Sequence, residues 1–238
     1  MLATVVASGL YTLVSPIFDA TYPRLSALAA RNPSPDLIST YRLASGLLAS
    51  LLFPLAMFLA FTGRSLIQLW TGDSQLAEAV SPVLALLSIG SALHGMMFMP
   101  HALALASGAS ALVLRTNVIL LLAFGPLIAI LTTWQGGVGA ALGWVILHAA
   151  YLLFGSIYTH RKLLPQISTT WLLRDLGIPG VVSVSAAMAG FTLARMVAAP
   201  PLHDVTIGAA TMLGAWAVLL VRQPTFRQWL YRTLPADF

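Results

Sequence analysis

Polar side chains recur at helical spacing along the first apolar stretch of the chain. Hydroxyl groups in such a row can hydrogen-bond to a polar ligand, and a carboxylate among them can bind a cation or a proton. Steps of three or four residues place the row on one face of a helix, whereas Val, Leu, Ala, Ile and Phe occupy the other faces. Small hydroxyls also bond between packed helices, so only the Asp shifts the balance toward a wet cavity. The row consists of Thr4, Ser8, Tyr11, Ser15, Asp19 and Tyr22.

Three histidines lie in later apolar stretches. His94 and His101 are close to two helical turns apart, so one face of a helix can carry both. His148 lies in the middle of another stretch. Each of the three is most simply a core residue whose ring nitrogens are hydrogen-bonded. His94 and His101 could form a metal-binding pair, but no third ligand lies at helical spacing from them. We keep His94 and His101 as candidates for a cavity lining and predict no metal site.

Several kinds of chemistry lack the residues that they require. The chain has no Cys, which excludes disulfides, thiolate metal sites and Cys nucleophiles. Its only Lys, Lys162, lies in a connection, so no late span offers a Schiff-base Lys for a retinal. No Gly-rich loop followed by Lys is present to hold a phosphate, and the scattered carboxylates form no pair suited to acid–base hydrolysis. We therefore expect neither enzymatic activity nor a cofactor.

The elements that carry these residues must be membrane helices. Of the 238 residues, 58% are hydrophobic and only 8% are charged, whereas about a quarter of a soluble domain is charged. So few charges cannot cover a globular surface, so lipid must solvate most of it. A net charge of +5 would indicate nucleic acid in a soluble protein. Here the basic residues cluster between apolar stretches, and we expect no nucleic-acid partner.

A membrane-spanning helix needs about 20 mostly apolar residues, and about seven stretches meet this requirement. The sequence therefore predicts an all-α polytopic membrane protein with about seven transmembrane helices. Residues 1–165 would form a bundle of about five spans, and residues 166–238 two terminal spans and an amphipathic C-terminal segment. The predicted spans are 2–22, 43–62, 79–104, 112–133, 138–158, 177–198 and 205–221.

Basic residues fall mainly on one side of the predicted bundle. Sorting the connections by alternate sides leaves only Arg64 and Arg195 on the poorer side. Because the richer side is normally cytoplasmic, the topology has its N-terminus outside and its C-terminus in the cytoplasm. The residues of the richer side are Arg24, Arg31, Arg42, Arg115, Arg161, Lys162, Arg174, Arg222, Arg227 and Arg232.

Three connections have the composition of short amphipathic helices that lie on the membrane. Residues 64–73, 163–175 and 225–234 mix Leu, Trp and Tyr with basic or small polar residues. Their tryptophans, Trp70, Trp171 and Trp229, would suit the level of the lipid headgroups.

Four segments together resemble one family of membrane proteins. The first is YPRLSAL (22–28), and the second is YRLASGLLASLLFPLAMFLAFTGRSLIQLWTGD (41–73) with its Leu-Trp-x-Gly turn. The others are FMPHALALASGASALVLRTNVILLL (98–122) and GGVGAALGWVILHAAYLL (136–153). In this order and spacing they are similar to segments of bacterial polysaccharide flippases of the multidrug/oligosaccharidyl-lipid/polysaccharide exporter superfamily.

The resemblance implies the carboxy-terminal half of such a flippase. Members have twelve to fourteen spans in two lobes that rock about a central cavity, and this chain resembles spans eight to fourteen. The chain would then be partial and would need a missing N-terminal lobe, or it would be a half-transporter that pairs with another chain. The expected function is to flip lipid-linked oligosaccharide across the bacterial inner membrane for surface polysaccharide synthesis.

The same resemblance implies which residues meet the cargo and the lipid. The first span matches a helix that lines the central cavity, where hydroxyls would contact sugar and a carboxylate would couple an ion. The last two spans would form a groove for the lipid tail. The candidate cavity residues are Tyr11, Ser15, Asp19, Tyr22, Arg24, His94 and His101.

Three other interpretations stay open. A multidrug/cation antiporter lobe of the same superfamily would favour a cluster of intramembrane carboxylates, of which only Asp19 is available. A polytopic glycosyl- or acyltransferase of the cell envelope would need a catalytic residue in a sizeable loop, and no connection exceeds about twenty residues. The third is a fragment without activity of its own.

Overall fold

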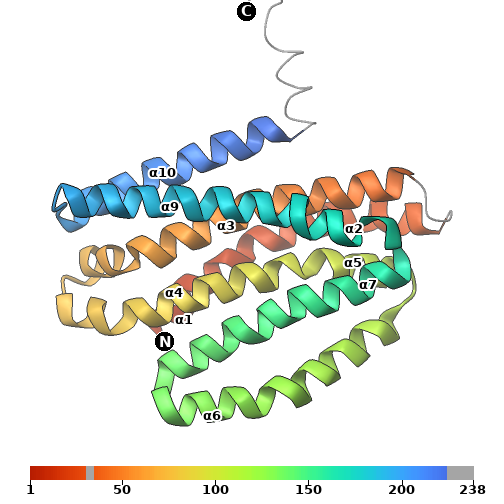
Figure 1. Cartoon of the computed structure of the whole chain (residues 1–238), viewed down its shortest axis with the longest axis horizontal. Helices are drawn as coiled ribbons and strands as arrows, with labels where there is room; N and C mark the ends of the chain where they lie inside the picture. The colour runs from red at the N-terminus through yellow and green to blue at the C-terminus, as the bar shows by residue number, and fades with distance from the viewer. Residues whose placement is uncertain (31–34, 224–238) are drawn as a thin grey trace, which may run out of the picture.

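The structure is a computed structural model that describes residues 1–30 and 35–223, and these residues form an all-α molecule. Long helices lie roughly side by side in one bundle (Figure 1). In lipid a backbone N–H or C=O group has no water to bond, so apolar stretches of this length satisfy their backbone within helices. This confirms the prediction of an all-α polytopic membrane protein.

The chain begins with one nearly continuous helical segment made of α1 (Leu2–Ser8), the 3-10 turn η1 (Gly9–Leu13) and α2 (Val14–Ala29). The next elements are α3 (Pro35–Thr71), α4 (Ser74–Met96), α5 (Phe98–Ala106) and α6 (Ser110–Ala150). A π-helical turn η2 (Tyr151–Gly155) leads into α7 (Ser156–Leu163). The short elements η3 (Pro165–Ile167), α8 (Ser168–Thr170) and η4 (Trp171–Gly177) precede α9 (Ile178–Met196) and α10 (Pro201–Arg222).

Within the described residues, six helical segments are long and apolar enough to cross a membrane, and one of them is long enough to do so twice. That segment, Ser110–Leu163, has 54 residues, which a straight helix would stretch to about 80 Å. It folds back at Gly136, where φ is 58° and ψ is −132° (Figure 1). The two arms touch where Gly139 faces Leu131 and Gly143 faces Ile128. The two arms of this segment and the other five segments correspond to the seven predicted spans.

Helix α3 forms the centre of the bundle. It packs against α2, α4, α9 and α10, and it is the most buried of the spans. Leu48, Leu52 and Ala56 on this helix have no exposed surface. The boundary predicted after residue 165 falls where α7 has ended, and the two spans beyond it, α9 and α10, both pack on α3.

The helix ends alternate between the two ends of the bundle. The turns α3–α4 and α9–α10 and the reversal at Gly136 lie at one end (left in Figure 1). The end of α2, the connection α5–α6 and the connection after α7 lie at the opposite end. Arg64 and Arg195 belong to helix ends of the first group, and the described basic residues of the richer set belong to the second. We call the second end the arginine-rich end.

Two of the three segments predicted to be separate helices on the membrane surface have a different structure. Residues 64–71 simply continue α3 to Thr71, and the turn that follows is capped by Asp73, whose Oδ1 accepts from Gln75 N at 2.9 Å. In the segment 163–175, Trp171 is fully buried and stacks on Tyr41 with ring centroids 6.2 Å apart. Composition alone did not reveal this partner, which lies far away in the sequence. The third segment, 225–234 with Trp229, lies outside the described residues, as do Arg31, Arg227 and Arg232.

The outer surface of most helices is apolar, as a lipid-facing surface should be. Many exposed side chains on α6, α9 and α10 are large aliphatic or aromatic groups. Because lipid tails are as apolar as these side chains, their exposure costs nothing in a bilayer. Examples are Leu114, Ile119, Leu121, Leu122, Val181, Met188, Leu193, Leu213 and Val218.

Candidate functional site

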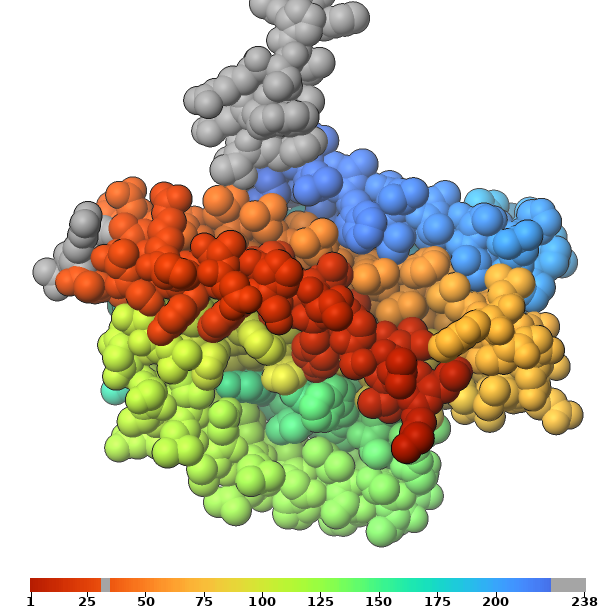
Figure 2. Space-filling view, turned by 180° about the vertical axis from the view of Figure 1, so that it is seen from behind, coloured from red at the N-terminus to blue at the C-terminus, as the bar shows by residue number. Residues whose placement is uncertain are grey.

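The segment α1–η1–α2 is the exception to this apolar surface. It lies uncovered across one face of the molecule (red in Figure 2). Its buried side consists of Ala3, Ala7, Leu10, Val14 and Leu25, each at most 5% exposed. Its outer side carries Thr4, Ser8, Ser15 and Asp19 of the predicted polar row, together with Thr12, and all five are exposed, whereas Tyr11 and Tyr22 of the row are half-buried.

Two prolines make the outer side of this segment more polar. Pro16 and Pro23 have no backbone N–H, so the carbonyl groups of Thr12 and Asp19 lose the donor that a continuous helix would supply. The clash of the Pro16 ring with the preceding turn accounts for the tighter 3-10 winding at Gly9–Leu13. Both prolines are exposed, so they lie on the outer face together with the polar side chains.

The polar side chains of this row differ in whether they form hydrogen bonds within the segment itself. Ser8 Oγ donates to Val5 O at 2.8 Å, and Thr12 Oγ1 donates to Gly9 O at 2.7 Å. Ser15 and Asp19 have no side-chain partner within residues 1–30 and 35–223. A carboxylate without a partner is costly at membrane depth, so this face must meet water or polar groups of another molecule.

Tyr11 joins the polar row to a cluster of imidazole and indole rings. Its hydroxyl is 2.8 Å from His94 Nδ1 on α4. The His94 ring lies 4.4 Å from the His148 ring on α6, measured between centroids, and His148 lies 4.1 Å from Trp144. His148 Nδ1 is 2.8 Å from the carbonyl oxygen of Trp144. Three helices therefore meet through a continuous row of polar aromatic groups.

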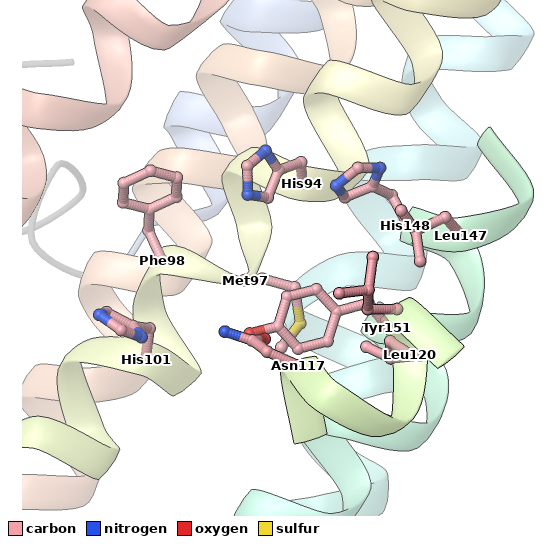
Figure 3. Close-up of a pocket in the computed structure, with 10 residues that line it drawn as sticks. His94, Met97, Phe98, His101, Asn117, Leu120, Leu147, His148 and Tyr151 are labelled. Atoms are coloured by element: carbon pink, nitrogen blue, oxygen red, sulfur yellow. The ribbon is translucent and has the colours of Figure 1, made fainter. Parts of the chain in front are cut away.

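A cavity of about 360 Å³ opens beside this cluster. In Figure 2 the face is hollowed beneath α1–α2, between the yellow-green and green helices. Figure 3 shows the lining, with His94 and His148 at one rim and His101 and Asn117 farther along. The remaining lining residues are Met97, Phe98, Leu120, Leu121, Leu147 and Tyr151. The wall is thus largely apolar, with a few hydrogen-bonding groups, as is typical of sites for organic ligands.

The break between α4 and α5 positions two of the histidines. Pro100 has no N–H to donate to Met96, and α4 ends at Met96 while α5 begins at Phe98. His94 and His101 lie on either side of this break, and both line the cavity. The prediction that they share one face therefore agrees with their placement.

The seven candidate residues occupy different parts of the molecule. Tyr11 and His94 are in contact, and His101 lines the same cavity. Ser15 and Asp19 lie on the exposed face, whereas Tyr22 is half-buried and stacks on Phe18 with centroids 5.5 Å apart. Arg24 lies at a different cavity, lined by α3, α9 and α10.

Sequence reasoning missed the partner residues on α6. His148 was interpreted as a core residue, and Trp144 was not considered. The signal was present, because Trp144 and His148 are four residues apart and must lie on one face of a helix. Their proximity to His94 depends on the packing of α4 against α6, where Gly90 leaves room for the Trp144 ring.

The arrangement suits hydrogen bonding and stacking rather than metal chemistry. Among the residues that the structure describes, no three His, Cys, Asp or Glu side chains lie close enough to hold a metal ion. Imidazole, amide and phenol groups around an apolar wall can bond the hydroxyls of a ligand and cover its apolar faces.

Comparison of the chain with protein-family models, with curated proteins and with solved structures finds no match. The argument for function therefore rests on the polar face and the cavity beside it.

Proposed function

We propose that this chain is one half of a transporter that flips lipid-linked oligosaccharide across the bacterial inner membrane for surface polysaccharide synthesis. One observation carries the proposal: the outer side of the first membrane helix carries a row of hydroxyl groups and a carboxylate, whereas large apolar side chains dominate the other outer surfaces of the described residues. Thr4, Ser8, Thr12, Ser15 and Asp19 of helix 2–29 are exposed, whereas Leu10, Val14 and Leu25 are buried. Such a face is stable in a membrane where it borders a water-filled passage or another protein.

The cavity beside this face supports a sugar as the transported group. Sugars present hydroxyl groups at their edges and C–H groups on their faces. Tyr11, His94, His101 and Asn117 offer hydrogen bonds, and Phe98 offers an aromatic surface. A cation antiporter is less well supported, because no group of three or more His, Cys, Asp or Glu side chains that could hold a metal ion gathers among the described residues.

We further propose that the arginine-rich end is cytoplasmic, so that the N-terminus is outside. A second lobe or a second chain would cover the polar face and complete the passage. In this arrangement Ser15 and Asp19 line the passage near its cytoplasmic half, and His94 lies deeper.

Thiol labelling tests the passage directly, because the chain has no Cys of its own. We expect a membrane-impermeant maleimide to label Ser15→Cys and Thr12→Cys in native membranes. Leu122→Cys and Met188→Cys, which are also exposed but lie on apolar faces, should stay unlabelled because we expect them to face lipid. Equal labelling of both pairs, or labelling of neither pair, would contradict the proposed water-filled passage.

The cargo is tested separately in the host bacterium. Deleting the gene should deplete surface polysaccharide and accumulate its lipid-linked precursor, measured in extracted lipids. The double variant Tyr11→Phe with Asp19→Ala should accumulate the precursor while it still inserts into the membrane. Normal precursor levels in the deletion strain would exclude this cargo even if the passage exists.

A further inference from the structure

A second cavity, of about 580 Å³, lies at the arginine-rich end on a part of the molecule that the proposed passage does not use. Its walls come from the first turns of α3, from η4 and the start of α9, and from the last turn of α10. Arg24 of α2 lies at its edge. Helices distant in sequence therefore converge on one site, and α3, α9 and α10 lie side by side there (Figure 1).

The cavity carries a strong positive charge. Its lining holds four guanidinium groups, those of Arg24, Arg42, Arg174 and Arg222, and a single carboxylate, that of Asp175. Asp175 is already occupied, because Arg42 Nε and Nη2 both donate to it at 2.8 Å. The other three arginines form no ion pair with any described residue, which leaves three uncompensated positive charges around one cavity.

The walls of this cavity are held in place by specific contacts. The paired hydrogen bonds between Arg42 and Asp175 tie α3 to η4. At the far side, Gln223 lies against Gly46, where a Cβ atom would be only 2.8 Å from Gln223 Nε2. Gln223 Nε2 also donates to Ser50 Oγ at 3.4 Å. These contacts join both ends of the site to α3, so the arginines surround a formed cavity rather than an open surface.

The inner wall is apolar, and this decides the kind of anion that fits. Leu43, Ile178, Pro179 and Leu219 line the cavity beneath the arginines. A soluble anion gains nothing from such a wall, whereas a lipid can place its phosphate among the guanidinium groups and its acyl chains against the aliphatic side chains. Guanidinium groups bind phosphate oxygens in pairs, and basic pockets between membrane helices on the cytoplasmic side hold anionic headgroups.

We propose that this cavity binds the phosphate headgroup of an anionic membrane lipid from the leaflet at the arginine-rich end. The site would anchor α9 and α10 to α3 through the lipid and would act whether or not the chain transports oligosaccharide. The chemistry shared by the two possible sources is a negatively charged phosphate group, and a free phosphate ion is the source to be distinguished from the lipid.

The test uses the purified full chain in a mild detergent. Phosphatidylglycerol or phosphatidylcholine is added, and native mass spectrometry measures the lipid retained. We expect the chain to prefer phosphatidylglycerol. The double variant Arg174→Gln with Arg222→Gln should bind it about thirtyfold more weakly, at roughly fivefold for each guanidinium lost. Both side chains are exposed and unpaired within the described part of the chain, so the fold should survive, as an unchanged thermal midpoint without added lipid would verify.

The matched control is Arg161→Gln with Lys162→Gln. It removes the same charge at the same end, from exposed residues that do not line the cavity. This control should keep the preference for phosphatidylglycerol. An equal loss in both double variants would show a diffuse attraction to the headgroups and would overturn the proposal. Displacement of the lipid by millimolar inorganic phosphate would assign the cavity to a soluble anion instead.

Discussion

One pair of buried polar side chains, Tyr41 and His160, is hydrogen-bonded across two helices. Tyr41 on α3 is fully buried, and its hydroxyl is 2.7 Å from His160 Nε2 on α7. The Trp171 ring lies 4.8 Å from the His160 ring, between centroids. His160 Nδ1 and Trp171 Nε1 have no hydrogen-bond partner among the described residues. The Tyr41–His160 bond is therefore the main polar link between these two helices.

Tyr41→Phe should destabilise the molecule. The change removes a buried hydroxyl and leaves His160 Nε2 without its partner, at a cost of about 1 kcal/mol. The measurement is the free energy of unfolding in mixed micelles titrated with a denaturing detergent. Tyr158→Phe is the control, because Tyr158 is exposed and its hydroxyl forms no described bond. Equal stability of the two variants would mean that the Tyr41 bond contributes nothing.

At the scale of elements, the hairpin within α6 depends on glycines that let its arms touch. A Cβ atom on Gly139 would lie 1.9 Å from the carbonyl oxygen of Leu131 on the other arm. Backbone cannot move aside as a flexible side chain can, so the two arms would have to separate.

Gly139→Ala should therefore lower the stability of the molecule by about 2 kcal/mol, as overpacking of a tight contact does. The same substitution at Gly180 on α9 provides the control, since nothing lies within 4 Å of its Cβ position. Because Ala favours a helix over Gly by about 1 kcal/mol, Gly180→Ala should be neutral or stabilising. Thermal unfolding measures both, and matching midpoints would refute the close contact.

The positions of the spans could be predicted from hydropathy, because each span satisfies its own backbone and is encoded locally. The polar row of the first span was found for the same reason. Its outward orientation could not be predicted, since that depends on how Leu10 and Val14 pack against distant helices. Trp171 shows the same limit: its amphipathic neighbours suggested an interface, but Tyr41 and His160 enclose it.

The candidate site was only partly predictable. Tyr11 and His94 were each recognised by residue type, but their contact joins segments that are far apart in the chain. Arg24 lies near the polar row in sequence but lines the cavity formed by α3, α9 and α10, which the sequence alone does not reveal.

At the scale of the whole molecule, the two ends differ in charge, and this difference predicts the orientation in the membrane. The α3–α4 turn lies at the end poor in basic residues, and the α5–α6 connection lies at the arginine-rich end. Both connections carry an exposed Ser, Ser74 and Ser107.

Ser74→Cys should react with an impermeant thiol reagent added to intact cells from outside. Ser107→Cys should react only after the membrane is permeabilised, because we propose that the arginine-rich end is cytoplasmic. Each position is the control for the other, and the absence of natural Cys removes background. The reverse pattern would invert the proposed topology and place the lipid site in the outer leaflet.

The reversal at Gly136 has a mechanical consequence for the cavity beside His94. The first arm of this hairpin, residues 110–135, supplies Asn117, Leu120 and Leu121 to the wall, and most of its side chains are exposed. The opposite wall belongs to α4 and α5, which are embedded in the bundle around α3. The arm is thus the less tightly packed wall of the cavity, and a bulky ligand would displace this arm rather than the packed centre of the molecule.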